Sequence, residues 1–139
     1  MKALSAFFIS AALLLAAGCS TQHTVAESRG QGTTETYDAN FERVWSAAVA
    51  AAQMGDLFIV NADKSHGYIA AKRGWRPETF GENVGIWVRQ TSPSQTVVEV
   101  VSRQAGPPIL NLRNWEKRIL ASIQATLSTE TSNVSPRGA

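Results

Sequence analysis

The stretch VGIWVRQ at residues 84–90, followed by TSPS at 91–94 and QTVVEVVSR at 95–103, decides the fold. In the first segment valine and isoleucine alternate with Trp87 and Arg89, and the second segment alternates in a similar way. A period of two places successive side chains on opposite faces of a β-sheet. The Pro-containing tetrapeptide between the two segments is typical of a turn. The stretch therefore predicts an antiparallel hairpin.

A second hairpin is predicted immediately upstream. LFIV at residues 57–60 and YIAAK at 68–72 are strand-like runs, and the segment between them is rich in turn-forming residues. Residues 74–83 then predict the first long loop of the chain. A further short strand is predicted at residues 34–39, where Thr and Tyr suit a pleated surface.

Two segments have the period of amphipathic helices. Asn40 is a suitable N-cap for a helix that ends near Gly55, and a second helix is predicted over residues 111–127. Both carry an apolar stripe at the spacing typical of a helix with one buried face. The stripes are Phe41, Val44, Trp45, Ala48 and Ala52 in the first helix, and Leu112, Trp115, Ile119, Ile123 and Leu127 in the second.

The predicted order of elements is β-α-β-β-β-β-α. Short connections between the middle strands favour antiparallel pairing. Each helix has a single apolar stripe, so both helices must cover one face of the sheet. The sequence therefore predicts an α+β fold: a two-layer sandwich of a five-stranded, mostly antiparallel sheet with two helices on one face.

The folded unit is expected at residues 34–127. Residues 20–33 hold only two apolar side chains, too few to order the segment, so we expect a flexible tether over residues 19–33. A tether of this length has an r.m.s. reach of roughly 20 Å. The polar residues 128–139 predict a disordered tail.

Residues 1–18 have the layout of a secretory signal peptide, in which Lys2 precedes an apolar run from Ala3 to Ala17. A membrane-spanning helix needs about 20 apolar residues, so this run is too short to remain as a span. Cys19, the only cysteine in the chain, follows directly. A secreted protein with a single cysteine has a leftover thiol to explain.

Residues 15–20, LAAGCS, resemble the lipobox of bacterial lipoproteins, in which a small residue precedes a cysteine and an aliphatic residue stands upstream. Leu15 lies one position further upstream than the usual pattern places it. The resemblance implies diacylglycerol on the sulfur of Cys19, cleavage before Cys19 and acylation of the new amino group, which together give a stable membrane anchor. Ser20 resembles the residue found at this position in lipoproteins sent to the outer membrane of Gram-negative bacteria.

The order of elements, with FERVW at residues 41–45 and the hairpin at 63–71, resembles the helix-grip domain of BamC-type outer-membrane lipoproteins. The resemblance covers nearly all of residues 34–127. It implies a small domain of the cell envelope that is lipid-anchored to the outer membrane and faces the periplasm.

The charge balance gives no indication of a charged polymer as partner. The chain has 13 Lys and Arg against 11 Asp and Glu, and the arginines are scattered along it. We therefore expect no nucleic-acid partner.

Catalytic and metal-binding patterns are weak. His66 lies in a turn, where histidines are commonly solvated, and Asp63 with His66 supplies only two of the ligands that a metal site needs. Glu78 and Glu82 share the long loop as the two carboxylates of a glycoside hydrolase would, but loop carboxylates are mostly solvated and Arg76 is a nearby partner. We therefore expect no enzyme, no metal and no cofactor.

The aromatic residues give a better indication of a binding site. Trp87 alternates away from the apolar face and is expected on the open face of the sheet beside Arg89, with Trp75 and Phe80 of the adjoining loop over the same area. An exposed apolar patch with charge at its rim favours an interaction site, and Trp and Arg are frequent anchors there. The alternative is that the loop covers Trp87 and forms a small second core.

Together these features predict a membrane-anchored lipoprotein that acts as a non-catalytic interaction module of the cell envelope. Its expected partners are the membrane, through lipid on Cys19, and an envelope protein, bound at the aromatic surface or along an edge strand. The alternative is a lipid-tethered carrier of a small apolar or peptidoglycan-derived ligand, held between the sheet and the helices. The residues expected to bind the protein partner are Trp87, Arg89, Trp75 and Phe80.

Overall fold

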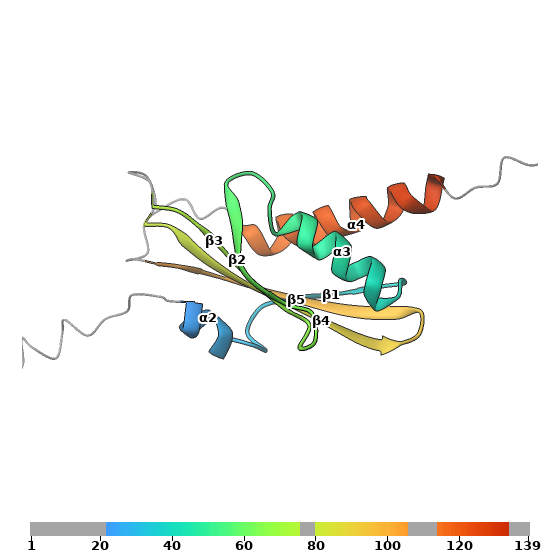
Figure 1. Ribbon diagram of the computed structural model, residues 1–139, viewed down its shortest axis with the longest axis horizontal. Helices are drawn as coiled ribbons and strands as arrows, with labels where there is room; N and C mark the ends of the chain where they lie inside the picture. Colours follow the sequence, from blue (N-terminus) through green and yellow to red (C-terminus); the bar gives the residue numbers. More distant parts are fainter. Residues whose placement is uncertain (1–21, 76–79, 106–113, 134–139) are drawn as a thin grey trace, which may run out of the picture.

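A computed structural model describes residues 22–75, 80–105 and 114–133 (Figure 1). The five strands and the two longer helices follow the predicted order of elements, and one short helix precedes them. In chain order the elements are α2 (Gln22–Glu27), β1 (Thr33–Tyr37), α3 (Phe41–Ala51), β2 (Leu57–Asp63), β3 (Tyr68–Arg73), β4 (Glu82–Ser92), β5 (Gln95–Gln104) and α4 (Trp115–Asn133).

The strands form one antiparallel sheet in the order β1-β5-β4-β3-β2. The hairpin of β4 and β5 lies at its centre and turns between Ser92 and Gln95, where the sequence predicts a turn. Helices α3 and α4 cover one face of the sheet (Figure 1). This confirms the α+β two-layer sandwich with five antiparallel strands and two helices on one face.

The face under α3 and α4, which we call the inner face, carries the main core. Trp115, Ile119 and Ile123 of α4 are fully buried there together with the alternating Val and Ile residues of β4 and β5. Helix α3 starts as predicted, because the side-chain oxygen of Asn40 accepts a hydrogen bond from the backbone N–H of Arg43 at 3.0 Å. The alanines of α3 allow this helix to pack closely on the sheet and on α4.

The opposite face, which we call the outer face, has a cover that the sequence prediction missed. Helix α2 packs on β4 and β5, and its Val25 is fully buried against Trp87 and Val101. The predicted flexible tether is therefore wrong for residues 22–33. The low apolar content of this segment does not prevent its ordering, because the sheet supplies most of the apolar surface. Helix α2 buries Val25 against that surface.

Two further boundaries differ from the prediction. Helix α4 extends to Asn133, so the predicted disordered tail is wrong for residues 128–133, which are tied to α3 through Arg43. The predicted loop at 74–83 is shorter, because β4 begins at Glu82 and pairs there with Arg73.

The predicted signal peptide, Cys19, the helix start at 111 and residues 134–139 lie outside the described residues. Within the described ranges, no helix combines the length and apolar character needed to cross a membrane.

Candidate functional site

Trp87 lies on the opposite side of β4 from Val84, Ile86 and Val88, as the alternation predicts, but it is not open to solvent. Its side chain is only 7% exposed, because α2 lies over it and Tyr68 of β3 packs beside it, with ring centroids 5.1 Å apart. The expectation that Trp87 forms part of an open surface is therefore wrong. The alternative of a small second core holds, but the element that covers Trp87 is α2 and not the 74–83 loop. A role for Trp87 in binding a partner stays a prediction.

Gly85 makes room for this second core. A Cβ atom on Gly85 would lie 2.7 Å from Cη2 of Trp87 and 2.8 Å from Cγ1 of Val25. Such distances are shorter than carbon–carbon contacts allow, so the indole ring and α2 both lie directly on the bare backbone of β4. Glycine at this position therefore sets how close α2 comes to the sheet.

The segment after α2 is fixed to β5 by Glu99. One carboxylate oxygen of Glu99 accepts hydrogen bonds from the backbone N–H groups of Gly30 and Gly32, at 2.5 and 3.1 Å. Charge-assisted bonds of this kind are stronger than those between neutral groups. The chain from Val25 to Gly32 is thus held on the outer face by apolar contact, by this carboxylate and by a hydrogen bond from Arg103 to Gln31.

The other three predicted binding residues are exposed but do not form one surface. Trp75 and Phe80, 69% and 39% exposed, both lie in the connection between the end of β3 at Arg73 and the start of β4 at Glu82. Arg89 is exposed on β4 where that strand pairs with Val97. Arg89 stands seven positions after Glu82 along β4, so the two residues are roughly 24 Å apart. The structure therefore brings Trp75 and Phe80 to one end of the sheet and places Arg89 toward the other.

A row of four side chains crosses the outer face one residue inward from the β3–β4 connection. The register pairs Phe58 of β2 with Lys72 of β3, Lys72 with Asn83 of β4, and Asn83 with Arg103 of β5. The ammonium of Lys72 lies 5.2 Å from the ring centroid of Phe58. The guanidinium of Arg103 donates to the backbone oxygen of Ser102 and to the side-chain oxygen of Gln31. Neither cation forms an ion pair with a carboxylate of the described residues.

A buried charged cluster lies at the same end of the sheet on the inner face. Arg73 donates to Asp56 at 2.7 Å, and its second guanidinium nitrogen lies 3.7 Å from Glu82. Glu82 is 2% exposed and also accepts a hydrogen bond from the indole N–H of Trp115. A buried carboxylate needs such partners to remain charged. The cluster therefore closes the end of the sandwich by joining β3, β4 and α4.

This cluster corrects the interpretation of Glu82 as a loop carboxylate. Glu82 belongs to a strand, and its partner is Arg73 of the neighbouring strand. Glu78 and Arg76 lie outside the described residues. A guanidinium and an indole N–H both contact Glu82, so its carboxylate is part of the packing between β3, β4 and α4. Sequence reasoning missed the cluster, since Arg73 and Trp115 are far apart along the chain.

Asp63 and His66 form a local turn, which agrees with the structural interpretation of His66. One oxygen of Asp63 accepts hydrogen bonds from the Ser65 hydroxyl and the His66 backbone N–H, and the other lies 2.7 Å from the His66 ring. These bonds lower the pKa of Asp63 to about 2, chiefly through Ser65 and then His66. Among the described residues, no group of three or more His, Cys, Asp or Glu side chains is placed to hold a metal ion.

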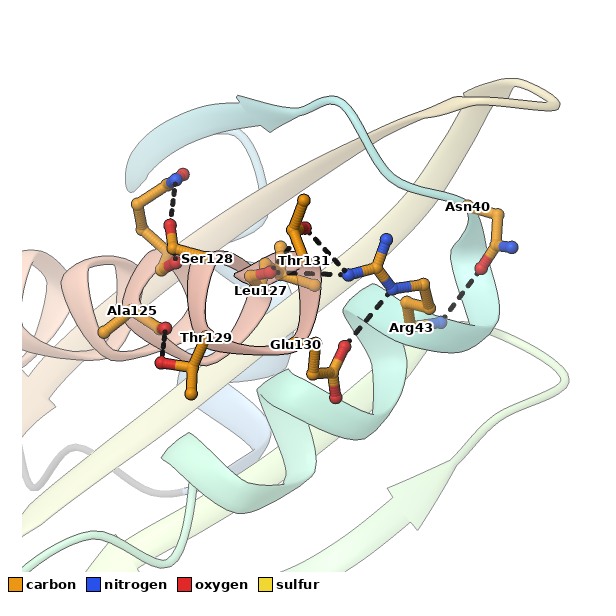
Figure 2. A network of polar contacts seen from close by, with 9 residues as sticks. Asn40, Arg43, Ala125, Leu127, Ser128, Thr129, Glu130 and Thr131 are labelled. Atoms are coloured by element: carbon orange, nitrogen blue, oxygen red, sulfur yellow. Dashed lines mark hydrogen bonds and ion pairs between the residues drawn. The ribbon is translucent and has the colours of Figure 1, made fainter. Parts of the chain in front are cut away.

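A polar groove of about 190 Å³ lies where the end of β1 meets the start of α3 and the last turns of α4. Figure 2 shows Arg43 of α3 reaching across to α4 beside this groove. Its Nε lies 3.2 Å from Glu130, and a second nitrogen donates to the oxygens of Leu127 and Thr131. Through these contacts the guanidinium of Arg43 links α3 to α4.

The inner core bears on the alternative function as a carrier. The side chains that would line a space between sheet and helices, such as Ile86, Val100 and Ile123, are fully buried in one contiguous cluster. Tyr37 closes this core beside the polar groove, and its hydroxyl donates to the backbone oxygen of Leu120 at 2.9 Å. Burial, and then the neighbouring Glu35, raise the pKa of Tyr37 far above its usual range. Among the residues that the structure describes, no observation on the inner face favours a carrier.

Comparisons with known proteins identify no family. No protein-family model matches the chain, and no curated protein matches it. Among solved structures, the di-domain ARO/CYC StfQ from the steffimycin biosynthetic pathway is 12% identical with a TM-score of 0.48, over 70% of this chain. This chain spans only 43% of that protein.

Two other solved structures are similar over a larger share of their own length. A protein of unknown role from Bacillus thuringiensis is 11% identical with a TM-score of 0.45, over 73% of this chain and 95% of its own. The Zhui aromatase/cyclase from Streptomyces sp. R1128 is 12% identical with a TM-score of 0.37, over 72% and 87%. All three TM-scores are below 0.5, so these likenesses carry nothing about what this chain binds or catalyses.

Proposed function

We propose that the chain is a bacterial lipoprotein, anchored to the outer membrane by lipid on Cys19, and that its domain is a non-catalytic interaction module facing the periplasm. Support for the anchor comes from the signal-like residues 1–18 and the lipobox-like residues 15–20. Support for an interaction module comes from the strand at one edge of the sheet.

The observation that carries the proposal is the apolar character of the β2 edge. Among the described strands, β2 pairs only with β3, and no described residue pairs with its other edge. Phe58 and Val60 of this strand are 45% and 41% exposed. A bulge between Ile59 and Asn61 leaves Val60 outside the regular pairing, and bulges commonly redirect a side chain.

The opposite edge provides the contrast. The exposed residues of β1 are Thr34, Glu35 and Thr36, which present no apolar side chain. Open edges with apolar side chains are templates for pairing with another chain. A strand of an envelope protein, added to β2 through backbone hydrogen bonds, would bury both Phe58 and Val60.

In-cell photo-crosslinking tests this proposal, with a photoreactive amino acid at Val60 and a matched probe at Thr34. Both positions are exposed and both lie on edge strands. We expect a discrete protein adduct from position 60 and none from position 34. Adducts of equal intensity from both, or none from either, would contradict an interaction edge at β2.

A separate experiment tests the anchor. The intact mass of the protein extracted from membranes is expected to exceed that of residues 19–139 by several acyl chains, and Cys19→Ser is expected to abolish the excess. A soluble wild-type product of unmodified mass would contradict the lipoprotein assignment.

A further inference from the structure

Helix α2 places a strict limit on the distance between the domain and the membrane. Gln22, its first residue, is three residues after Cys19. Three residues of fully extended chain span at most about 11 Å. If Cys19 carries the lipid, as the proposed function holds, the domain cannot float on a long tether while α2 is docked, because Val25 is buried on the outer face.

The direction of α2 shows which part of the domain lies nearest the anchor. Gly30 is bonded to Glu99, which pairs with Trp87 in the sheet. Val25 lies over Gly85, two residues nearer to the start of β4. The chain, followed backward toward Cys19, therefore runs toward the end of the sheet where β3 and β4 are connected, and Figure 1 shows α2 at this end.

The side chains at this end have the chemistry of a membrane-contact surface. Trp75 and Phe80 are exposed within the β3–β4 connection. Lys72 and Arg103 lie on the outer face, two strands apart, which is roughly 10 Å. Aromatic rings favour the headgroup level of a bilayer, and Lys and Arg near the surface are attracted by anionic lipids.

We propose that Lys72 and Arg103 of the outer face, together with Trp75 and Phe80 of the β3–β4 connection at the same end of the sheet, lie on the headgroups of the bilayer that holds the lipid of Cys19. The inference rests on the proposed anchor and adds an orientation to it. The docked α2 then acts as a short rigid spacer. It keeps this end of the sheet close to the lipid surface, and the β4–β5 turn lies at the far end of the domain.

Site-specific quenching in vesicles tests the orientation. With Cys19 blocked by lipid, a cysteine introduced elsewhere is the only free thiol. Gly74→Cys suits an environment-sensitive label, since a Cβ at Gly74 meets no atom within 4 Å. Ser94→Cys, exposed in the β4–β5 turn, is the matched control. The lipidated variants are incorporated into phosphatidylethanolamine–phosphatidylglycerol vesicles that contain a lipid with a nitroxide close to the headgroup.

The label at position 74 is expected to lose roughly half of its fluorescence, as for a group at the headgroup–acyl boundary, and the label at position 94 almost none. Equal quenching at the two positions would overturn the orientation. In the double variant Lys72→Glu with Arg103→Glu, quenching at position 74 should fall toward that at position 94. Unchanged quenching would overturn the assignment of the headgroup contact to the two cations.

Flotation of the same vesicles separates this inference from the proposed function. If the labelled Gly74→Cys variant floats with the vesicles while its label stays unquenched, the orientation is overturned and the anchor stays intact. Wild-type protein that does not float would overturn the anchor, and the orientation with it. A protein adduct formed at position 74 in cells, without quenching in vesicles, would assign the aromatic pair to a protein partner instead.

Discussion

The two faces of the sheet are covered in very different ways. On the inner face, α3 and α4 complete a cluster of 21 buried residues. On the outer face, α2 contributes Val25 to a small cluster with Trp87 and Val101. Full burial of one valine stabilises by about 1.5–3 kcal/mol. The inner face therefore sets the stability of the domain, whereas the outer cover is a local unit that can open without global unfolding.

The largest effect is expected from a change on the inner face. Trp115→Ala removes a fully buried indole and leaves the buried carboxylate of Glu82 without one of its donors. We expect the free energy of unfolding to fall by about 3–5 kcal/mol, or the protein not to fold. Urea denaturation followed by circular dichroism measures the change. Trp75→Ala is the matched control, since this Trp is exposed and its loss should change stability by less than about 0.5 kcal/mol.

Trp87→Ala sharpens the comparison, because the same residue type is lost from the outer face. Its side chain is buried, but only in the small cluster beneath α2. The expected loss in unfolding free energy is about 2–3 kcal/mol, less than for Trp115→Ala, because α2 can settle into part of the space. A melting temperature identical to that of the wild type would mean that α2 does not hold Trp87 in solution.

A third change disturbs the outer face by adding a methyl group instead of removing a side chain. Gly85→Ala places a methyl group where the rings of Trp87 and the side chain of Val25 now lie. We expect a loss of about 1–3 kcal/mol and faster proteolysis before β1, since overpacking displaces α2. Gly74→Ala serves as the control, because nothing lies within 4 Å of its added methyl group. Equal behaviour of the two variants would contradict the close approach of α2 to β4.

The smallest effect is a change in pKa. The chain has two tyrosines, Tyr37 on the inner face and Tyr68 beside Trp87, and burial raises the pKa of both. A raised tyrosine pKa stabilises the fold fully below the unfolded value of about 10, and this contribution is lost as the pH rises through the folded value. Absorbance titration of Val25→Ala should show the pKa of Tyr68 closer to 10 and that of Tyr37 unchanged. Two unchanged tyrosine transitions would show that α2 does not shield Tyr68.

The sequence was sufficient to predict the inner face. The alternation in residues 84–90 and the stripe through Trp115 and Ile119 both face one continuous core. The sequence of each element therefore shows by itself which of its faces is buried. The cap at Asn40 is local for the same reason, because its bond to Arg43 spans three residues. These features are present in short windows of sequence and need no knowledge of distant residues.

The outer face was predictable only in part. Alternation correctly separates Trp87 from the inner side chains. The residue that covers Trp87, however, is Val25, one of only two apolar residues in the polar segment 20–33. A helix of six residues whose apolar side chains are the adjacent Val25 and Ala26 has no helical period to detect. Its attachment through Glu99, 69 residues after Gly30, is equally invisible in any short window. The contact of Glu82 with Trp115 could not be predicted for the same reason, because the two residues are 33 positions apart in the sequence.

Native-state hydrogen exchange on the wild-type protein tests the unequal faces most directly. The account predicts that the amides of Gly30 and Gly32 are protected, because both donate to Glu99. It also predicts that they open far more readily than the amides of α4 around Ile119 and Ile123. If residues 22–32 showed no protection, this segment would be a flexible tether after all, and the orientation proposed for the domain would be contradicted. Protection equal to that of α4 would contradict the account in the other direction, by making α2 part of a single cooperative core.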